Sequence, residues 1–119
     1  MSALSKKLRD AEGGMIMFWC PGCESSHGVW IDRAGHPVWG YNGNPDAPTF
    51  TPSILVTYRH PKGHTNDNPA PVGYNGEYVN DICHSYITDG KIQFLGDCTH
   101  KLAGQTVDLP DWNSVADNF

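Results

Sequence analysis

Four cysteines are the residues of this chain whose type and spacing most clearly suggest chemistry. Cys20 and Cys23 enclose Pro-Gly in a Cys-x-x-Cys motif, and Cys83 and Cys98 follow much later in the chain. A Cys-x-x-Cys loop directs two thiolates at one point, and Zn²⁺ takes four such ligands in a tetrahedral arrangement. The sequence therefore predicts one zinc site made by these four cysteines. Less favoured ligands are the nearby histidines His27, His84 and His100.

The two later cysteines flank a segment that is typical of a β-hairpin. Asp89-Gly90 separates two β-prone runs, and Asp-Gly is a common two-residue hairpin turn. If the strands pair directly across this turn, Cys83 faces Gly96, and side chains two apart share a face of the ladder. Cys98 and His100 would then lie on the face of Cys83, whereas His84 would point to the opposite face.

Two disulfides and a thioredoxin-like redox motif are the competing interpretations of the cysteines. The short apolar run 15–19 before Cys20 does not make a secretion signal, so we expect an intracellular protein. A reducing compartment disfavours structural disulfides. A redox motif would require a helix after Cys23, and the residues there show no helical period. Metal binding is therefore the favoured interpretation.

A catalytic metal site is the alternative to a closed, structural one. Such a site keeps one position open for water and has a general base nearby. The candidate catalytic residues in this alternative are His84, Asp97 and His100. The zinc deaminase signature and the His-Glu-x-x-His motif are both absent from the sequence. We therefore favour the closed site and lean away from an enzyme, and we expect no organic cofactor.

Length and composition predict a small, mainly β protein. With 119 residues, 13 Gly and 9 Pro, the chain is typical of short antiparallel strands joined by many turns. We expect an N-terminal tail or short helix over 1–14, one zinc-stapled β domain over 15–112, and a C-terminal tail over 113–119. Strands are expected at 15–19, 28–32, 37–41, 50–59 and 105–109, with 28–41 forming a hairpin. A long surface loop is expected over 60–80, with His60 and His64 solvated.

The charge of the chain restricts its partners. The formal net charge is −5, which argues against binding the phosphates of nucleic acids. No apolar stretch approaches the roughly 18–20 residues of a membrane-spanning helix, so we expect no membrane association. A protein partner is the remaining expectation.

Several longer strings resemble a family of small, uncharacterised phage and prophage proteins. They are FWCPGC at 18–23, WGYNG at 39–43, PTFTPSILV at 48–56, CHSYITDGKIQFL at 83–95 and DCTHKLAGQTVDLPDW at 97–112. Members of this family are sometimes labelled ammonia monooxygenase, a label that does not fit these residues. The resemblance covers most of 18–112, and the loop 60–80 departs from the shorter connection expected of the family. It implies a phage origin and a location in the cytoplasm of a host bacterium.

The function that these observations favour is that of a zinc-binding phage or prophage accessory protein. It would act by binding a protein, with a host or defence component as the candidate partner. The alternative is a small zinc-dependent hydrolase or another metalloenzyme.

Overall fold

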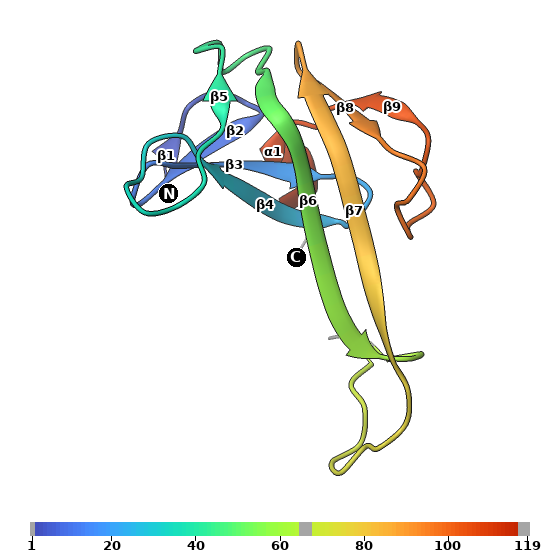
Figure 1. Cartoon of the computed structure of the whole chain (residues 1–119). Coiled ribbons are helices and arrows are strands. Elements are labelled where there is room, and N and C mark those ends of the chain that lie inside the picture. Colours follow the sequence, from blue (N-terminus) through green and yellow to red (C-terminus); the bar gives the residue numbers. More distant parts are fainter. Residues whose placement is uncertain (1, 65–67, 117–119) are drawn as a thin grey trace.

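The computed structural model describes residues 2–64 and 68–116, which form two antiparallel sheets and one short helix (Figure 1). The first sheet has the strand order β1 (Ser2–Ala3), β2 (Leu8–Ala11), β3 (Met15–Cys20) and β4 (Ser25–Trp30). The second has the order β5 (Gly40–Tyr41), β6 (Phe50–Pro61), β7 (Tyr78–Thr88), β8 (Lys91–Phe94) and β9 (Thr106–Asp108). The helix α1 spans Trp112–Ala116. The mainly β prediction is confirmed.

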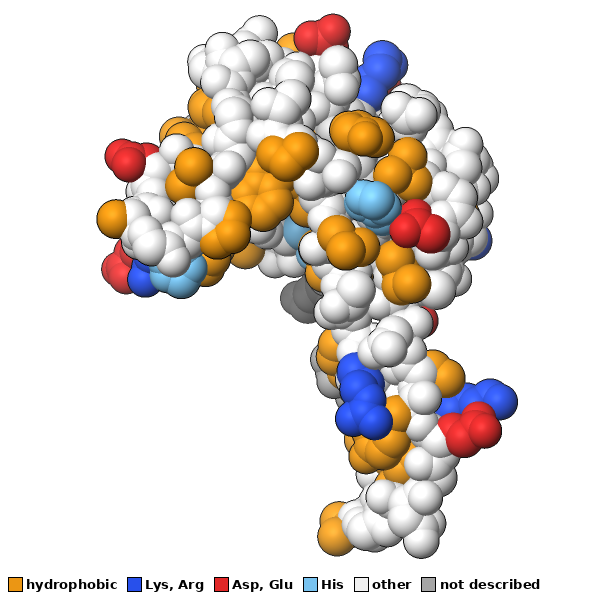
Figure 2. Space-filling view, in the orientation of Figure 1, with side chains coloured by type: hydrophobic (Ala, Val, Ile, Leu, Met, Phe, Trp, Pro, Cys, Tyr) orange, Lys and Arg blue, Asp and Glu red, His pale blue; other side chains and the backbone are white. Residues whose placement is uncertain are grey.

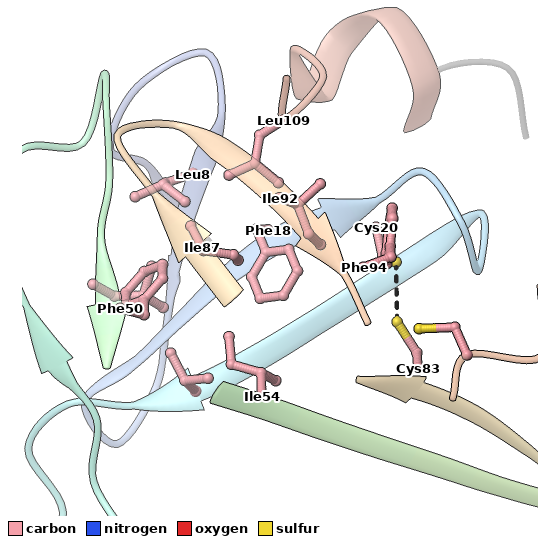
Figure 3. Close-up of a cluster of buried hydrophobic side chains, with 13 residues drawn as sticks. Leu8, Phe18, Cys20, Phe50, Ile54, Cys83, Ile87, Ile92, Phe94 and Leu109 are labelled. Carbon is pink, nitrogen blue, oxygen red and sulfur yellow. Dashed lines mark hydrogen bonds between the residues drawn. The ribbon is translucent and has the colours of Figure 1, made fainter. Parts of the chain in front are cut away.

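The core lies between the two sheets and follows the alternation of side chains along the strands. In β3, Ile16, Phe18 and Cys20 are buried, while the residues between them are partly exposed. Phe18 stacks on Phe50 of β6 with ring centroids 6.5 Å apart. Burying one face of each sheet in this way is the main apolar stabilisation of such a fold. The inward side of β3 thus ends at Cys20, next to the second sheet (Figure 3).

The expected helix or tail at the N-terminus is wrong for the described residues. Residues 2–11 form β1 and β2, and Leu8 is fully buried opposite Phe18 in the β2–β3 ladder. Gly13 and Gly14 both have a positive φ and make the turn into β3, which residues other than glycine adopt with strain. The spacing of the apolar residues also fitted a helix, but burial of Leu8 against the core favours the strand.

The expected hairpin over 28–41 is also wrong. The tight turn after Cys20 returns the chain directly, so that β4 pairs with β3, and β5 pairs with β6 instead. A single backbone bond from Trp39 N to Trp30 O, 2.8 Å long, joins the two segments. The strands expected at 15–19, 50–59 and 105–109 are confirmed as β3, β6 and β9.

The hairpin of β7 and β8 has the predicted register. Thr88 pairs with Lys91, Ile87 with Ile92 and Ser85 with Phe94. Asp89 and Gly90 have φ values of 51° and 78°, as the Asp-Gly turn requires. The turn prediction therefore places the residues before and after the hairpin correctly as far as Leu95.

The strands β6 and β7 extend beyond the body of the protein as a two-stranded arm (Figure 1). Because β6 continues to Pro61 and β7 begins at Tyr78, the connecting loop is shorter than the expected 60–80. His60 is buried, and its Nε2 lies 2.8 Å from the carboxylate of Asp81, so the prediction that it is solvated is wrong. Residues 65–67 of the loop lie outside the described part.

The chain after β9 packs back on the first sheet. Trp112, the first residue of α1, makes an edge contact with Trp19 at 6.0 Å. The segment expected as a tail over 113–119 thus begins within α1, and its residues 117–119 lie outside the description. No helix in the described residues is long and apolar enough to cross a membrane.

Candidate functional site

Three polar side chains form a connected chain of hydrogen bonds on the outer face of the second sheet. The Ser53 hydroxyl lies 3.1 Å from Nε2 of His84, and Nδ1 of His84 lies 3.1 Å from Oδ2 of Asp97. With the Nδ1–H tautomer, His84 donates to Asp97 and accepts the proton of Ser53 at Nε2. A serine, an imidazole and a carboxylate in this order form a nucleophile, a general base and an orienting group.

The strand register explains why Ser53 reaches His84. His84 of β7 lies opposite Leu55 of β6, so Ser53 is its diagonal neighbour, within reach of a long side chain. Between Phe50 and Ile54 the β6–β7 pairing is interrupted. An irregularity of this kind turns a side chain away from its regular direction and is frequent beside active sites. Ser53 lies in this interrupted stretch and has no register partner in β7.

Asp97 reaches His84 because the chain leaves the β8 ladder in a turn. Leu95 N still donates to His84 O at 2.9 Å, but Cys98 N then donates to Leu95 O at 3.2 Å. The chain returns at Thr99, whose N–H donates to Ile82 O at 2.9 Å. This turn over 95–98 adds residues relative to a continuous ladder and brings the Asp97 carboxylate to Nδ1 of His84.

The three residues differ in access to solvent. The His84 side chain is 27% exposed and that of Asp97 is 51% exposed, while Ser53 is half-buried. The neighbouring Ser85 is buried on the inner face of β7, next to the core. The hydroxyl of Ser53 is therefore the one that an external substrate can reach at this histidine.

A second cluster, on the inner face of β7, brings thiols and an imidazole together. Ligand atoms of Cys20, Cys23, His27 and Cys83 all lie within 4.8 Å of one another. The Sγ atoms of Cys20 and Cys83 are 3.7 Å apart (Figure 3), and all four cysteines are free thiols. Cysteine and histidine side chains gathered in this way can hold a metal ion.

Proximity of the three thiols shifts their proton affinities. Hydrogen bonds from Cys23 and Cys83 lower the pKa of the Cys20 thiol. The same contacts raise the pKa of Cys23 to about 12 and raise that of Cys83. Without a cation, the cluster thus favours a single thiolate shared by three sulfurs. A bound dication would allow all three to ionise, because metal coordination deprotonates thiols.

Cys98 and His100 lie beside this cluster without joining its four-residue group. They gather with Cys83 in a second set of atoms within 4.8 Å. The Cys98 thiol accepts from His84 N at 3.2 Å and donates to His84 O at 3.3 Å. The ring of His100 packs on Phe94 and against Gly22, where an added Cβ would meet it at 2.3 Å.

A cavity of about 640 Å³ adjoins the cysteines. It is lined by residues of the turn after Cys20, by Val56–Tyr58 of β6 and by Asp81–Cys83 of β7. The cavity therefore lies between the first sheet and the base of the arm.

The structure groups the sequence-predicted residues into two sites. Of the expected zinc ligands, Cys20, Cys23 and Cys83 come together with His27, and Cys98 is adjacent. Of the candidate catalytic residues, His84 and Asp97 are in contact, whereas His100 lies on the other side of β7 with the cysteines.

Ser53 was not among the residues predicted from the sequence. This serine lies in a Pro-Ser-Ile string without a recognised nucleophile motif, and it is 31 residues from His84. The available signal was the alternation along two paired strands, which would have required the β6–β7 register.

A comparison with known protein families gives one family that covers most of the chain. A family model described as bacterial ubiquitination-like system serine protease (BubE) matches residues 3–95. This is most of the chain. The protein belongs to the BubE family. The matched region of this BubE protein includes Ser53, His84 and the cluster of Cys20, Cys23, His27 and Cys83, and ends before Asp97. No curated protein and no solved structure gives a significant match.

The family places the chain with components of bacterial ubiquitination-like systems. The match says nothing of a phage or prophage origin, or of the cytoplasm of a host cell, so these remain predictions. The same holds for the expectation of a protein-binding accessory role and for the expectation that nucleic acid is not bound.

Proposed function

We propose that this protein is a serine peptidase with Ser53 as nucleophile, His84 as general base and Asp97 as orienting carboxylate. The observation that carries the proposal is the continuous Ser53–His84–Asp97 hydrogen-bond chain, with both contacts at 3.1 Å. The family description supports the reaction class and suggests that the substrate is a protein of a bacterial ubiquitination-like system. We prefer the serine peptidase to the metallohydrolase alternative, because His84 already has a serine to activate.

The first half-reaction forms an acyl-enzyme. His84 Nε2 takes the proton of Ser53 as its Oγ attacks the substrate carbonyl carbon, and Asp97 stabilises the imidazolium that results. Because Ser53 has no register partner in β7, we propose its N–H as a donor to the oxyanion. When the C–N bond breaks, His84 returns the proton to the leaving amine.

The second half-reaction regenerates the serine. A water molecule gives a proton to His84 Nε2 and attacks the ester carbonyl, and the ester C–O bond breaks as His84 protonates Ser53 Oγ. The acyl group leaves as a carboxylic acid. No group other than these three residues, the backbone and water is needed for the balance of atoms.

The edge of β6 is suited to bind an extended substrate segment. The strand β5 pairs only with Phe50 and Thr51, and Trp39 Nε1 donates to Ser53 O at 3.3 Å. Beyond Ser53, no strand of the described part borders β6 on that side. His84 and Ile82 direct their carbonyls to Leu95 and Thr99, away from β6. Their partners Leu55 and Thr57 are therefore in non-hydrogen-bonded pairs and direct their own N–H and C=O groups to the open edge.

An added strand along this edge would place a substrate bond at Ser53. Strand addition supplies affinity through backbone hydrogen bonds and specificity through alternate side chains. Leu55 is 58% exposed, and other exposed apolar and basic side chains continue along the arm (Figure 2). We therefore propose an unfolded, extended segment of a protein as the substrate.

Blocking the open edge tests this binding mode. Thr57→Pro removes the N–H that points to the edge and leaves the β6–β7 bonds intact, because proline is tolerated where the N–H faces solvent. We expect KM for a protein substrate to rise about tenfold, the loss of one to two hydrogen bonds, with kcat for a small ester unchanged. Thr57→Val, which keeps the N–H, is the matched control. Equal KM values for the two variants would contradict strand addition.

Covalent labelling tests the nucleophile directly. A fluorophosphonate probe reacts with serines that a neighbouring base activates, and peptide mass spectrometry identifies the residue. We expect label on Ser53 in the native protein, and none after denaturation or in His84→Ala. Absence of label on Ser53 in the folded protein, or labelling that does not depend on His84, would refute the proposal.

The cofactor expected from the sequence belongs to a separate proposal. We propose Zn²⁺ as the ion of the cysteine–histidine cluster, because thiolate and imidazole ligands in a four-ligand set suit this metal. It takes part in no chemical step of the peptidase mechanism above, whose groups lie on the opposite face of β7.

A further inference from the structure

We propose that Cys20, Cys23, His27 and Cys83 bind one zinc ion, and that this ion positions His84 and Asp97 for catalysis. The metal-site proposal depends only on the geometry of the cysteine–histidine cluster. Its positioning role rests on the peptidase function proposed above. The ligand set differs from the four cysteines that the sequence suggested, because His27 takes the place of Cys98.

The sulfur geometry matches tetrahedral coordination. Two thiolates bound at about 2.3 Å from one zinc ion are about 3.8 Å apart, and the Cys20 and Cys83 sulfurs are separated by 3.7 Å. That distance is far too long for a disulfide. Cys23 N donates to Cys20 Sγ at 3.4 Å, which supports negative charge on that sulfur. The loop is thus already in the conformation that a bound ion requires.

His27 supplies an independent reason for a fourth ligand. Its Nε2 atom is buried and has no hydrogen-bond partner, although buried polar atoms nearly always have one. Donation of its lone pair to a metal ion would give this nitrogen a partner. Cys98, by contrast, already makes two hydrogen bonds with the backbone of His84. The Nε2 atom of His100 is also buried without a partner, but His100 gathers only with Cys83 and Cys98, whereas His27 gathers with three thiols. His27 therefore completes the set better than Cys98 or His100 does.

The ion would join the two sheets at the strand that carries the general base. Cys20 ends β3, Cys23 and His27 lie in the following turn and β4, and Cys83 belongs to β7. Alternation along β7 puts Cys83 on the inner face and His84 on the outer face. Anchoring the Cys83 sulfur consequently fixes the position of the adjacent His84 Cα atom, from which the imidazole extends.

Fixing β7 also fixes Asp97, because the turn that carries Asp97 is hydrogen-bonded to the backbone of β7. The 95–98 turn is attached at both ends, by Leu95 N to His84 O and by Thr99 N to Ile82 O. The Cys98 thiol spans the N and O of His84 between these attachments. A shift of β7 would move the turn with it and lengthen the contact to Ser53, which belongs to a different strand. The zinc ion would therefore act on catalysis through alignment.

Metal content and zinc K-edge absorption on the full-length protein test the site. We expect one zinc per chain with three sulfurs at about 2.3 Å and one nitrogen at about 2.0 Å. The measurement needs no substrate, so it tests the metal site independently of the peptidase proposal. Absence of zinc after expression in zinc-supplemented medium, or a shell of four sulfurs, would overturn the ligand assignment.

Two substitutions at His27 separate positioning from bulk stability. His27→Ala should lose at least tenfold in zinc affinity, whereas His27→Cys should restore a tetrahedral site with four thiolates. We expect kcat to fall at least tenfold in the alanine variant with KM nearly unchanged, and to recover in the cysteine variant. His64→Ala, in the loop of the arm, is the matched histidine control.

A spectroscopic readout follows the alignment itself. The His84 Nδ1 proton, held by Asp97, should give a distinct downfield NMR signal in the zinc-bound protein. We expect this signal to disappear in His27→Ala and to return in His27→Cys. If zinc is lost while the signal and kcat persist, the positioning role is refuted and the peptidase function is not. If Ser53 never reacts with the probe although three sulfurs and one nitrogen bind zinc, the peptidase function fails and the metal site stands.

Discussion

Ser53→Ala is expected to abolish peptide hydrolysis while leaving the protein folded. Removing the nucleophile of a Ser-His-Asp triad costs kcat on the order of 10⁴-fold or more. The substitution removes one oxygen from a half-buried side chain, and the hydrogen bond that is lost is the one to the partly exposed His84. The melting temperature should therefore change by less than about 2 °C. Hydrolysis of a protein substrate and thermal unfolding, measured on the same preparation, test the expected loss of activity and the expected retention of the fold.

Asp97→Asn is the companion variant, because it keeps the shape of the side chain and changes the tautomer of His84. An amide in this position can donate to Nδ1, which leaves the proton on Nε2 and prevents that nitrogen from accepting from Ser53. In a well-studied triad the same change lowers kcat by about 10⁴-fold. Asp81→Asn, on the arm, is the matched control and should retain activity. Full activity in Ser53→Ala, or equal activity in the two asparagine variants, would contradict the triad.

Some residues of each candidate site could be predicted from the sequence, and others could not. The Asp-Gly turn determines the register from Ser85 to Phe94, so the opposite orientation of Cys83 and His84 was accessible. The contact of His84 with Ser53 depends on the register between β6 and β7. These strands are connected by a long loop whose sequence does not specify a defined turn type. The interruption between Phe50 and Ile54 is a further tertiary feature. Local patterns carry no information about either.

The position of Cys98 illustrates a different limit. Continuing the ladder past Leu95 put Cys98 and His100 on the face of Cys83, and ligand atoms of these three residues do lie within 4.8 Å of one another. The turn over 95–98, which was not predicted, also brings the Cys98 thiol to the backbone of His84. A turn of this kind replaces ladder bonds with bonds to Ile82 and Leu95 at similar distances, so strand propensity alone does not exclude it. Similarly, the sequence fitted a short helix or a tail around Leu8, and the strand follows from burial of Leu8 opposite Phe18.

Cys20→Ser is expected to unfold the protein or to lower its melting temperature by more than 10 °C. Binding of structural zinc contributes on the order of 10–16 kcal/mol in small modules, which is comparable with the whole free energy of unfolding of a domain, about 5–15 kcal/mol. Cys20 is fully buried between the two sheets, and a serine there would lack the thiolate and bury an unsatisfied hydroxyl. Loss of this ligand would therefore release the β3–β4 turn from β7.

Cys98→Ser separates the two ligand sets that the sequence and the structure favour. The serine hydroxyl can still donate to His84 O and accept from His84 N, the two bonds that the thiol makes. With His27 as the fourth ligand, we expect this variant to retain one zinc per chain and to melt within about 4 °C of the native protein. Zinc content and thermal unfolding of both variants decide the matter: equal losses at Cys20 and Cys98 would restore the four-cysteine site. The contrast between the variants follows from a simple physical difference, since a buried thiolate needs a cation and a buried thiol needs only a hydrogen-bond partner.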